Sequence, residues 1–250
     1  EAVNKRHSYT MVRQGGIRFS APEVAYADDL LSFASNRQGL QDKSDMMSLS
    51  ANVLGLTIAT NKLRVFKYCG GDPTRQLYQE AILIYGLDYK ATRIPIQTEG
   101  SIKCLGVLYD IDYSGKSQYR ASYRQLQAIL RIVTKKKASP ETVKAVLSSS
   151  SANKIAYQGV LSAWSLEECR RLDLLFAAEH RKRTKNMSTA QTENIFQPVL
   201  QGGLGYDRLS SIIQERKLGL ITRVMKGKDE QTRWAVEMIV ARGAGKLGGD

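Results

Sequence analysis

Short apolar runs, separated by glycine, proline and polar residues, dominate the first part of the chain and predict β-strands. The expected strands are residues 9–13, 16–19, 56–58, 63–66, 81–85, 92–96 and 102–109. Residues 38–54 instead repeat apolar side chains every three to four positions, which predicts a helix that stops at Gly55. This order predicts an α+β fold, a sheet with a helix on one face, over residues 1–112.

A tight hairpin is expected within this region at residues 24–31, Val-Ala-Tyr-Ala-Asp-Asp-Leu-Leu. Asp28 would lie at or near its tip, because aspartate tolerates the left-handed backbone of such turns. Asp28 and Asp29 stand in an otherwise apolar run, and burying unpaired anions is very costly. A magnesium ion is a suitable partner, since two carboxylates with substrate phosphates commonly hold it. The alternative is a surface turn in which both aspartates are solvated.

Helical spacing takes over after Gly115 and predicts an all-helical region over residues 113–250. Helix starts are expected at Ser139-Pro140-Glu141, at the capping box Ser165–Glu168, at Asp207 and at Asp229. The glycine-rich residues 202–205 are expected to form a loop between two of these helices.

Length and composition fit one large domain or two small ones, with 250 residues of which 42% are hydrophobic. The chain has no run of eighteen apolar residues and its first residues are polar, so we expect no signal peptide and no membrane span. Three widely spaced cysteines and two histidines make a zinc site improbable and favour reduced thiols. We therefore expect an intracellular protein, nuclear or cytoplasmic. The first residue is not methionine, which suggests a piece of a longer protein.

A formal net charge of +13 predicts a polyanionic partner, with nucleic acid first and an anionic membrane second. Most of the excess lies in residues 118–186, which hold fourteen Lys or Arg against five Asp or Glu. A solvated helical surface explains the composition of this segment equally well.

Further segments follow the Tyr-Ala-Asp-Asp sequence in a definite order. They are Gly55-Leu56-Thr57-Ile58 with Lys62, then Lys103-Cys104-Leu105-Gly106-Val107, and finally Gln201-Gly202-Gly203-Leu204-Gly205. Their order and identity resemble the reverse transcriptase of non-LTR (LINE-type) retrotransposons over about residues 9–225. Ala59, Leu63 and Cys104 stand where that family has Asn, Thr and Tyr, which points to a divergent or decayed copy.

The resemblance implies an RNA-directed DNA polymerase that transfers nucleotides from dNTPs to a DNA primer on an RNA template. Residues 1–112 would be the C-terminal half of its palm, and residues 113–250 a helical thumb with C-terminal helices. Asp28 and Asp29 would be catalytic ligands of Mg²⁺ or Mn²⁺ in a two-metal site, with Asp28 the better placed and Asp29 a helper.

Other matched residues would contact the substrates. Tyr26 would shape the primer end, unless it is a core aromatic, and Lys62 would lie near the triphosphate, unless it is a plain surface lysine. The hairpin from Lys103 to Gly106 would grip the primer, although Gly106 also fits an ordinary turn. The thumb would follow the RNA–DNA hybrid by its shape. The basic residues assigned to this contact are Arg120, Arg124, Arg131, Lys135 and Lys136.

One part of the family pattern is missing. Reverse transcriptases supply a third aspartate from an earlier strand, behind a fingers subdomain, and residues 1–23 are too few for either. We therefore expect this fragment alone not to polymerise and to need the N-terminal fingers and palm of the same polypeptide. One alternative is a non-catalytic nucleic-acid-binding module from a decayed element. Another is a maturase-like relative that binds structured RNA, whose family typically has Phe-Leu-Gly-Phe at residues 104–107.

Overall fold

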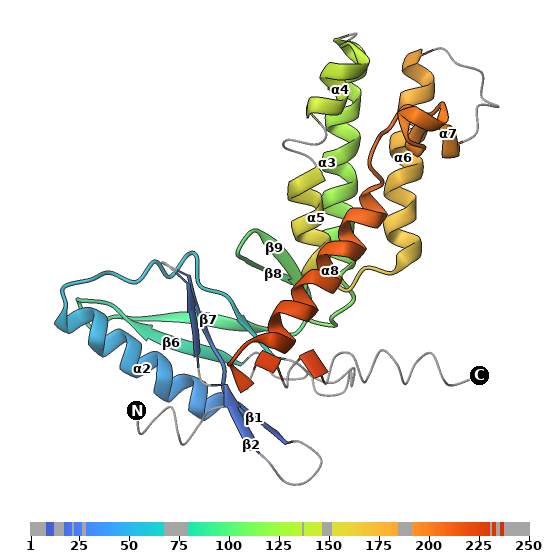
Figure 1. Cartoon of the computed structure of the whole chain (residues 1–250). Coiled ribbons are helices and arrows are strands. Elements are labelled where there is room, and N and C mark those ends of the chain that lie inside the picture. Colours follow the sequence, from blue (N-terminus) through green and yellow to red (C-terminus); the bar gives the residue numbers. More distant parts are fainter. Residues whose placement is uncertain are drawn as a thin grey trace. The chain divides into compact units, whose positions relative to one another are not determined.

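We describe a computed structural model of the chain, and its described part comprises ten segments. They are residues 9–12, 18–21, 23–26, 29–67, 80–136, 138–146, 152–184, 192–230, 232–233 and 236–237. The chain divides into two compact units: residues 1–105 with 110–112, and residues 106–109 with 113–250 (Figure 1). The first unit contains most of the strands and one long helix, and the second is mostly helical. The α+β class expected from the sequence is confirmed.

Two antiparallel strand pairs open the first unit. Strand β1 (Tyr9–Val12) pairs with β2 (Arg18–Ala21), and β3 (Glu23–Tyr26) pairs with β4 (Asp29–Ser32). Both pairs occupy segments where the sequence predicts strands, and the hairpin expected at residues 24–31 is confirmed in its two strands. The connections between the strands lie outside the described residues.

Helix α2 (Arg37–Val53) follows the second pair and confirms the helix expected over residues 38–54. The Asn36 side chain caps its start by accepting a hydrogen bond from the backbone N–H of Gly39 at 2.7 Å. Gly55, two residues beyond the last helical residue, has a φ of +67°. A glycine adopts this left-handed conformation without steric cost, which explains why the helix ends there.

A three-stranded sheet completes the core of the first unit. Its central strand β7 (Ala91–Gln97) pairs antiparallel with β6 (Ala81–Tyr85) and parallel with the short β5 (Val65–Phe66). The isoleucines Ile82, Ile84 and Ile94 are buried on one face of this sheet.

The strand expected at residues 56–58 was wrong, because these residues form no strand. Ile58 packs against the isoleucine cluster, whereas Leu56 is exposed. Ile58 is apolar because its side chain packs into this cluster. An apolar pattern of three residues cannot distinguish one such buried side chain from a strand. The strand expected over residues 63–66 is reduced to the two residues of β5.

Helix α2 covers the outer edge of β6 with polar side chains. The Gln41 amide donates to the Leu83 carbonyl and accepts from the Leu83 N–H, both at 2.9 Å. Arg37 donates to the Ala81 carbonyl and Asn52 to the Gly86 carbonyl. The Ser48 hydroxyl accepts from the Tyr85 N–H. These four helical residues are spaced by four, seven and four positions and so share one face of α2. This face of α2 is polar because its side chains form the hydrogen bonds that the backbone at the edge of β6 would otherwise lack.

The chain enters the second unit through a hairpin. Strands β8 (Ser101–Cys104) and β9 (Val107–Asp110) form a two-stranded sheet. Leu105 and Gly106 between them have φ angles of 48° and 78°. A two-residue connection with positive φ at both positions is the usual form of a tight hairpin. The single strand expected over residues 102–109 is therefore divided by a turn at its centre.

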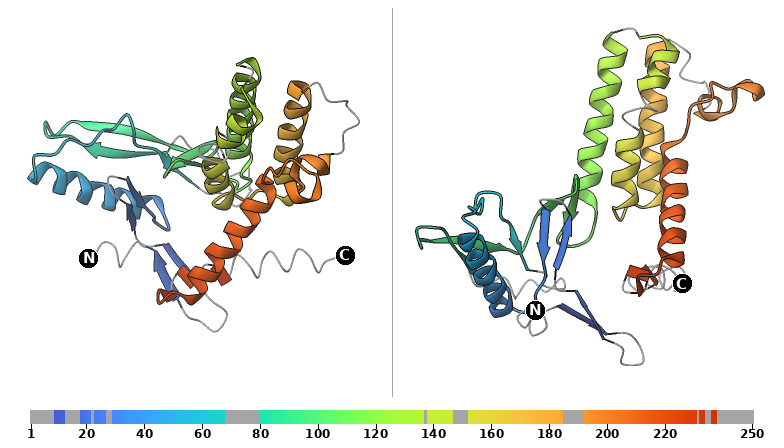
Figure 2. Two further views of the ribbon diagram at one scale, coloured as in Figure 1. Left: turned by 45° about the horizontal axis from the view of Figure 1, so that its top comes forward. Right: turned by 60° about the vertical axis from the view of Figure 1, so that its left-hand side comes forward.

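The second unit is a bundle of helices. They are α3 (Lys116–Lys135), α4 (Pro140–Val146), α5 (Ala152–Val160), α6 (Leu166–Thr184), α7 (Thr192–Phe196), the short 3₁₀ helix η3 (Val199–Gln201) and α8 (Leu209–Lys226). Helices α3, α5, α6 and α8 lie side by side (Figures 1 and 2). Their core includes the fully buried Leu126, Ile155, Leu172 and Ile213. No helix in the described part is both long enough and apolar enough to cross a membrane.

Most of the expected helix starts are confirmed. The backbone N–H of Ser165 donates to the Glu168 carboxylate at 2.9 Å, and the Glu168 N–H donates to Ser165 Oγ at 3.1 Å, which completes the capping box. Ser139 Oγ accepts from the Thr142 N–H at 3.2 Å at the start of α4. Asp229 likewise accepts from the Thr232 N–H at 3.3 Å.

The expected cap of α8 by Asp207 was wrong. Helix α8 begins after Arg208, which makes no side-chain capping bond. The buried carboxylate of Asp173, on α6, instead accepts hydrogen bonds from the Ser210 N–H at 3.3 Å and from the Ser210 hydroxyl. The start of α8 is packed into the bundle, so its N–H groups find their acceptor on a neighbouring helix.

Candidate active site and nucleic-acid interface

The hairpin of β3 and β4 presents the pair of aspartates. Tyr26 is opposite Asp29 and Glu23 is opposite Ser32, so only two residues connect the strands. Asp29 is the first residue of β4, as the sequence predicts, and it is not on a helix. Asp28 and the side chains of Tyr26 and Asp29 lie outside the described residues.

The donor set of this hairpin fits a magnesium ion only in part. Mg²⁺ keeps several waters and usually takes one or two protein carboxylates together with substrate phosphates. Two adjacent aspartates on one hairpin can supply those carboxylates. Among the side chains that the structure describes, no group of three or more His, Cys, Asp or Glu could hold a metal. The remaining ligands would have to come from substrate or from another part of the polypeptide.

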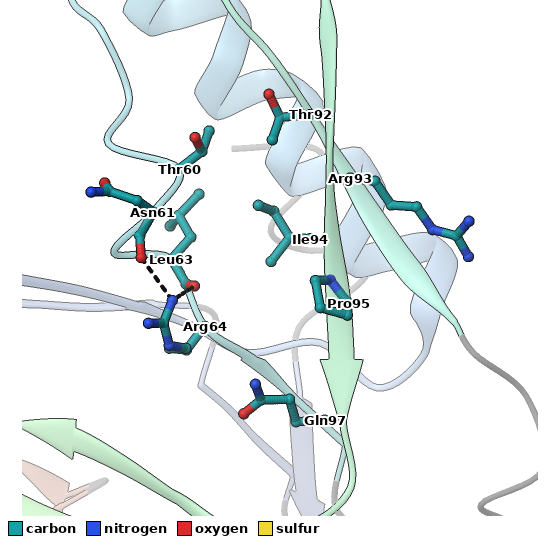
Figure 3. Close-up of a pocket in the computed structure, with 9 residues that line it drawn as sticks. All are labelled: Thr60, Asn61, Leu63, Arg64, Thr92, Arg93, Ile94, Pro95 and Gln97. Carbon is teal, nitrogen blue, oxygen red and sulfur yellow. Dashed lines mark hydrogen bonds between the residues drawn. The ribbon is translucent and has the colours of Figure 1, made fainter.

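A pocket of about 300 Å³ lies in the first unit beside β7 (Figure 3). It is lined by Thr60, Asn61, Leu63 and Arg64 on one side, and by Thr92, Arg93, Ile94, Pro95 and Gln97 of β7 on the other. The guanidinium of Arg64 donates to the carbonyl of Asn61 at 2.9 Å and to that of Leu63 at 2.7 Å. Lys62 belongs to the same turn and is exposed, but it is not a lining residue of the pocket.

The β8–β9 hairpin contains two of the expected primer contacts, Lys103 on β8 and Gly106 in the turn. Lys103 is exposed, as such a contact requires. Gly106 has a φ of +78°, and a Cβ added there would meet nothing within 4 Å. The glycine is therefore needed for the backbone conformation of the turn, and not because neighbouring atoms approach it closely.

A buried polar network holds the Gly106 side of this turn within the second unit. Gln118, on α3, accepts from the Leu108 N–H at 2.7 Å, and Gln158, on α5, donates to the Gly106 carbonyl at 3.3 Å. Ser122 links the two glutamines: it accepts from Gln118 Nε2 at 2.8 Å and donates to Gln158 Oε1 at 2.9 Å. All three side chains are buried. Sequence reasoning missed them, because a glutamine in a helix ordinarily indicates a solvated position.

Five cations lie along one face of α3, and we call this set the α3 stripe. Its members are Lys116, Arg120, Arg124, Arg131 and Lys135. All are exposed and are spaced by four, four, seven and four residues, so they share one face of the helix. The opposite face carries the buried Leu126, Leu130 and Val133. At 1.5 Å per residue the stripe is about 28 Å long.

The charge of the α3 stripe is uncompensated on its own helix. Helix α3 contains no acidic residue. In the part of the chain that the structure describes, no ion pair joins any of the five side chains to a carboxylate. Four residues of the expected contact therefore share one helix face: Arg120, Arg124, Arg131 and Lys135. Lys116 belongs to the same face and was missed. Its position four residues before Arg120 is the sequence signal that could have revealed it. Lys136, also exposed, follows the end of the helix.

Comparisons with known proteins add no relative: no protein-family model matches the chain, and no curated protein matches it.

Proposed function

We propose that this chain is the C-terminal palm and thumb portion of an RNA-directed DNA polymerase from a LINE-type retrotransposon. One observation carries the proposal: a hairpin with a two-residue connection bears Asp29 at the start of its second strand and leads directly into α2. Neighbouring carboxylates at such a turn, followed by a helix, have the order of the reverse transcriptase motif that the sequence resembles.

The family resemblance suggests a role for each matched residue, and the chemistry of its side chain suits that role. Asp28 and Asp29 would hold Mg²⁺ or Mn²⁺, which when bound activates the primer hydroxyl and neutralises charge on the phosphoryl oxygens. Tyr26, opposite Asp29 in the hairpin, would support the primer end. The exposed ammonium of Lys62 would neutralise part of the charge of the incoming dNTP.

The second unit would bind the RNA–DNA hybrid. The α3 stripe offers five exposed cations on one acid-free helix, which suits the phosphates of a nucleic-acid duplex. Lys136 would extend this contact beyond the end of the helix. Lys103 and the turn at Gly106 would contact the primer backbone.

The proposal includes a dependence on an upstream segment. Two carboxylates alone should bind Mg²⁺ weakly, because the ion gives up its waters reluctantly. A third carboxylate and a fingers subdomain from the same polypeptide would complete the site. By itself, the chain is expected to bind the hybrid without extending a primer.

A second candidate function is a non-catalytic nucleic-acid-binding module. The α3 stripe favours it, because all of its residues belong to the second unit and their charge needs nothing from the aspartate hairpin. Ala59, Leu63 and Cys104, which replace residues of the family motifs, are compatible with loss of catalysis.

Primer extension separates the two functions. The protein is produced with its upstream sequence and given an RNA template, a DNA primer, dNTPs and Mg²⁺. We expect template-dependent DNA synthesis that requires the metal. Binding of the hybrid with no synthesis, at any concentration of Mg²⁺ or Mn²⁺, would instead establish the binding module.

A further inference from the structure

Lys43, on α2, is a buried lysine for which the reverse transcriptase resemblance gives no role. Only 5% of its surface is exposed. An ammonium group is strongly hydrated, so its burial is unfavourable unless polar partners replace the lost water. Lysine is among the residues most rarely buried in this way.

A hydrogen-bond partner of Lys43 lies at the open end of the aspartate hairpin. Lys43 Nζ donates to the Phe33 carbonyl at 2.6 Å, and Phe33 directly follows the last residue of β4. Burial lowers the pKa of Lys43 below the ordinary value of a lysine, and the negative charge of Glu23 opposes this shift. Glu23 is opposite Ser32, the residue before Phe33, in the hairpin register.

The Lys43 ammonium group therefore meets the chain directly after β4, at the end of the hairpin away from the aspartates, where Glu23 begins the paired strand β3. Each strand is only four residues long. Such a short two-stranded hairpin is marginally stable alone and depends on what it packs against. The hydrogen bond from Lys43 to Phe33 attaches this hairpin to α2.

Helix α2 is itself a firm support. Its Arg37, Gln41, Ser48 and Asn52 side chains bond to the backbone along the edge of β6. Lys43 also lies within this helix, so its ammonium group is held relative to the three-stranded sheet.

We propose that Lys43 is a positioning residue, which fixes the open end of the β3–β4 hairpin to α2 and so determines where Asp28 and Asp29 lie. The part that concerns the metal ligands rests on the proposed function. The attachment of the hairpin to α2 by Lys43, which we call the clamp, does not depend on the proposed function.

Hydrogen exchange of the full chain tests the clamp. Lys43→Met keeps a side chain of similar length and removes the buried charge, so the fold is expected to be retained. Amides of residues 23–33 should exchange at least about tenfold faster in Lys43→Met, because the hairpin opens more often. Lys43→Arg, which keeps the donor and the charge, should restore most of the protection. The matched control is Lys90→Met, which removes an exposed lysine of the same unit and should change nothing.

Unchanged exchange of residues 23–33 in Lys43→Met would overturn the clamp. An equal acceleration over both units would also overturn it, because that result indicates a general loss of stability.

Manganese binding to the full chain, followed by electron paramagnetic resonance, tests the positioning of the ligands. Lys43→Met should weaken Mn²⁺ binding at least about fivefold relative to the unaltered chain, while Asp28→Asn should abolish it. An unchanged affinity for Mn²⁺ in Lys43→Met would overturn the positioning role. If the unaltered chain binds no Mn²⁺, the same comparison is made in the protein with its upstream sequence. No binding there by the unaltered protein means that the metal site of the proposed function fails, and the exchange experiment still decides the role of Lys43 in holding the hairpin.

Discussion

At the scale of single residues, the conformation of the glycine-rich loop at residues 202–205 requires a glycine at position 203. A Cβ at this position would lie 2.1 Å from the Gln197 carbonyl oxygen, far closer than any tolerated contact. The same carbonyl accepts a hydrogen bond from the Gly205 N–H at 2.8 Å. The loop can close in this way only because residue 203 has no side chain.

Gly203→Ala should therefore lower the free energy of unfolding of the second unit by about 3 kcal/mol, through a clash with backbone. Gly219→Ala is the matched control, because a Cβ there meets nothing within 4 Å and the residue lies within α8. It should raise stability by about 0.5–1 kcal/mol, since alanine favours a helix over glycine. Urea unfolding measures both changes, and similar values for the two variants would contradict this account of Gly203.

The buried carboxyl group of Asp173 should make the free energy of unfolding depend on pH. Burial raises the pKa of its carboxyl group above the ordinary value, although hydrogen bonds from Ser210 act in the opposite direction. The folded chain thus binds this proton more tightly than the unfolded chain. The stability that this group contributes is fully present below the ordinary carboxyl pKa and is lost as pH rises through the raised value.

Asp173→Asn cannot titrate and can still accept from the Ser210 N–H. Its free energy of unfolding should therefore fall less than that of the unaltered chain as the pH rises above about 4. Denaturant unfolding at a series of pH values gives the two curves. Parallel curves would exclude Asp173 as the source of the pH dependence.

At the scale of elements, the α3 stripe has a measurable consequence. Arg120→Gln with Arg124→Gln should weaken binding of an RNA–DNA hybrid. It should also reduce the slope of log affinity against log salt by about two, because two phosphate contacts and their released counterions are lost. The control is Arg170→Gln with Arg171→Gln, which removes two exposed arginines from α6. An equal loss in the control, or a binding affinity independent of salt, would contradict the assignment of the stripe.

Local elements were predictable from the sequence because their determinants are adjacent in it. The capping box from Ser165 to Glu168 spans only four residues, and Gly55 ends α2 by itself. The hairpin that carries Asp29 is equally local, since only two residues connect its strands.

Other parts were not predictable because their partners are far apart in the sequence. The cap of α8 joins residues 173 and 210, and the Gln118 network reaches Gln158 on another helix. Lys43 likewise meets Phe33 only after the hairpin has folded onto α2. A carboxylate, a glutamine and a lysine within helices are each typical of solvated surface, so no sequence pattern indicated that these three were buried.

At the scale of the whole molecule, the division between the units has a consequence for fragments. Residues 106–109 belong to the second unit although residues 110–112 belong to the first. They join the bundle through the bonds of Gln118 to Leu108 and of Gln158 to Gly106. A fragment beginning at residue 113 leaves the two buried glutamines with unpaired groups.

A fragment of residues 106–250 should therefore be more stable than one of residues 113–250, by about 1–3 kcal/mol for each buried group left without a partner. Chemical unfolding of the two fragments gives the difference. The longer one should also bind the RNA–DNA hybrid with the salt dependence of the full chain, since it contains the whole α3 stripe. Equal stability of the two fragments would show that the network does not hold β9 to the bundle.

The central claim concerns the chemistry of the aspartate hairpin, and incorporation of a single nucleotide tests it most directly. The protein with its upstream sequence is compared with its Asp28→Asn variant, and with Asp88→Asn as a control in which an exposed carboxylate of the same unit is lost. Asp28→Asn should reduce the rate at least about 1000-fold while binding of the hybrid is unchanged, because the charge that holds the metal is removed. Asp88→Asn should incorporate normally. Full incorporation by the Asp28→Asn variant would contradict the account.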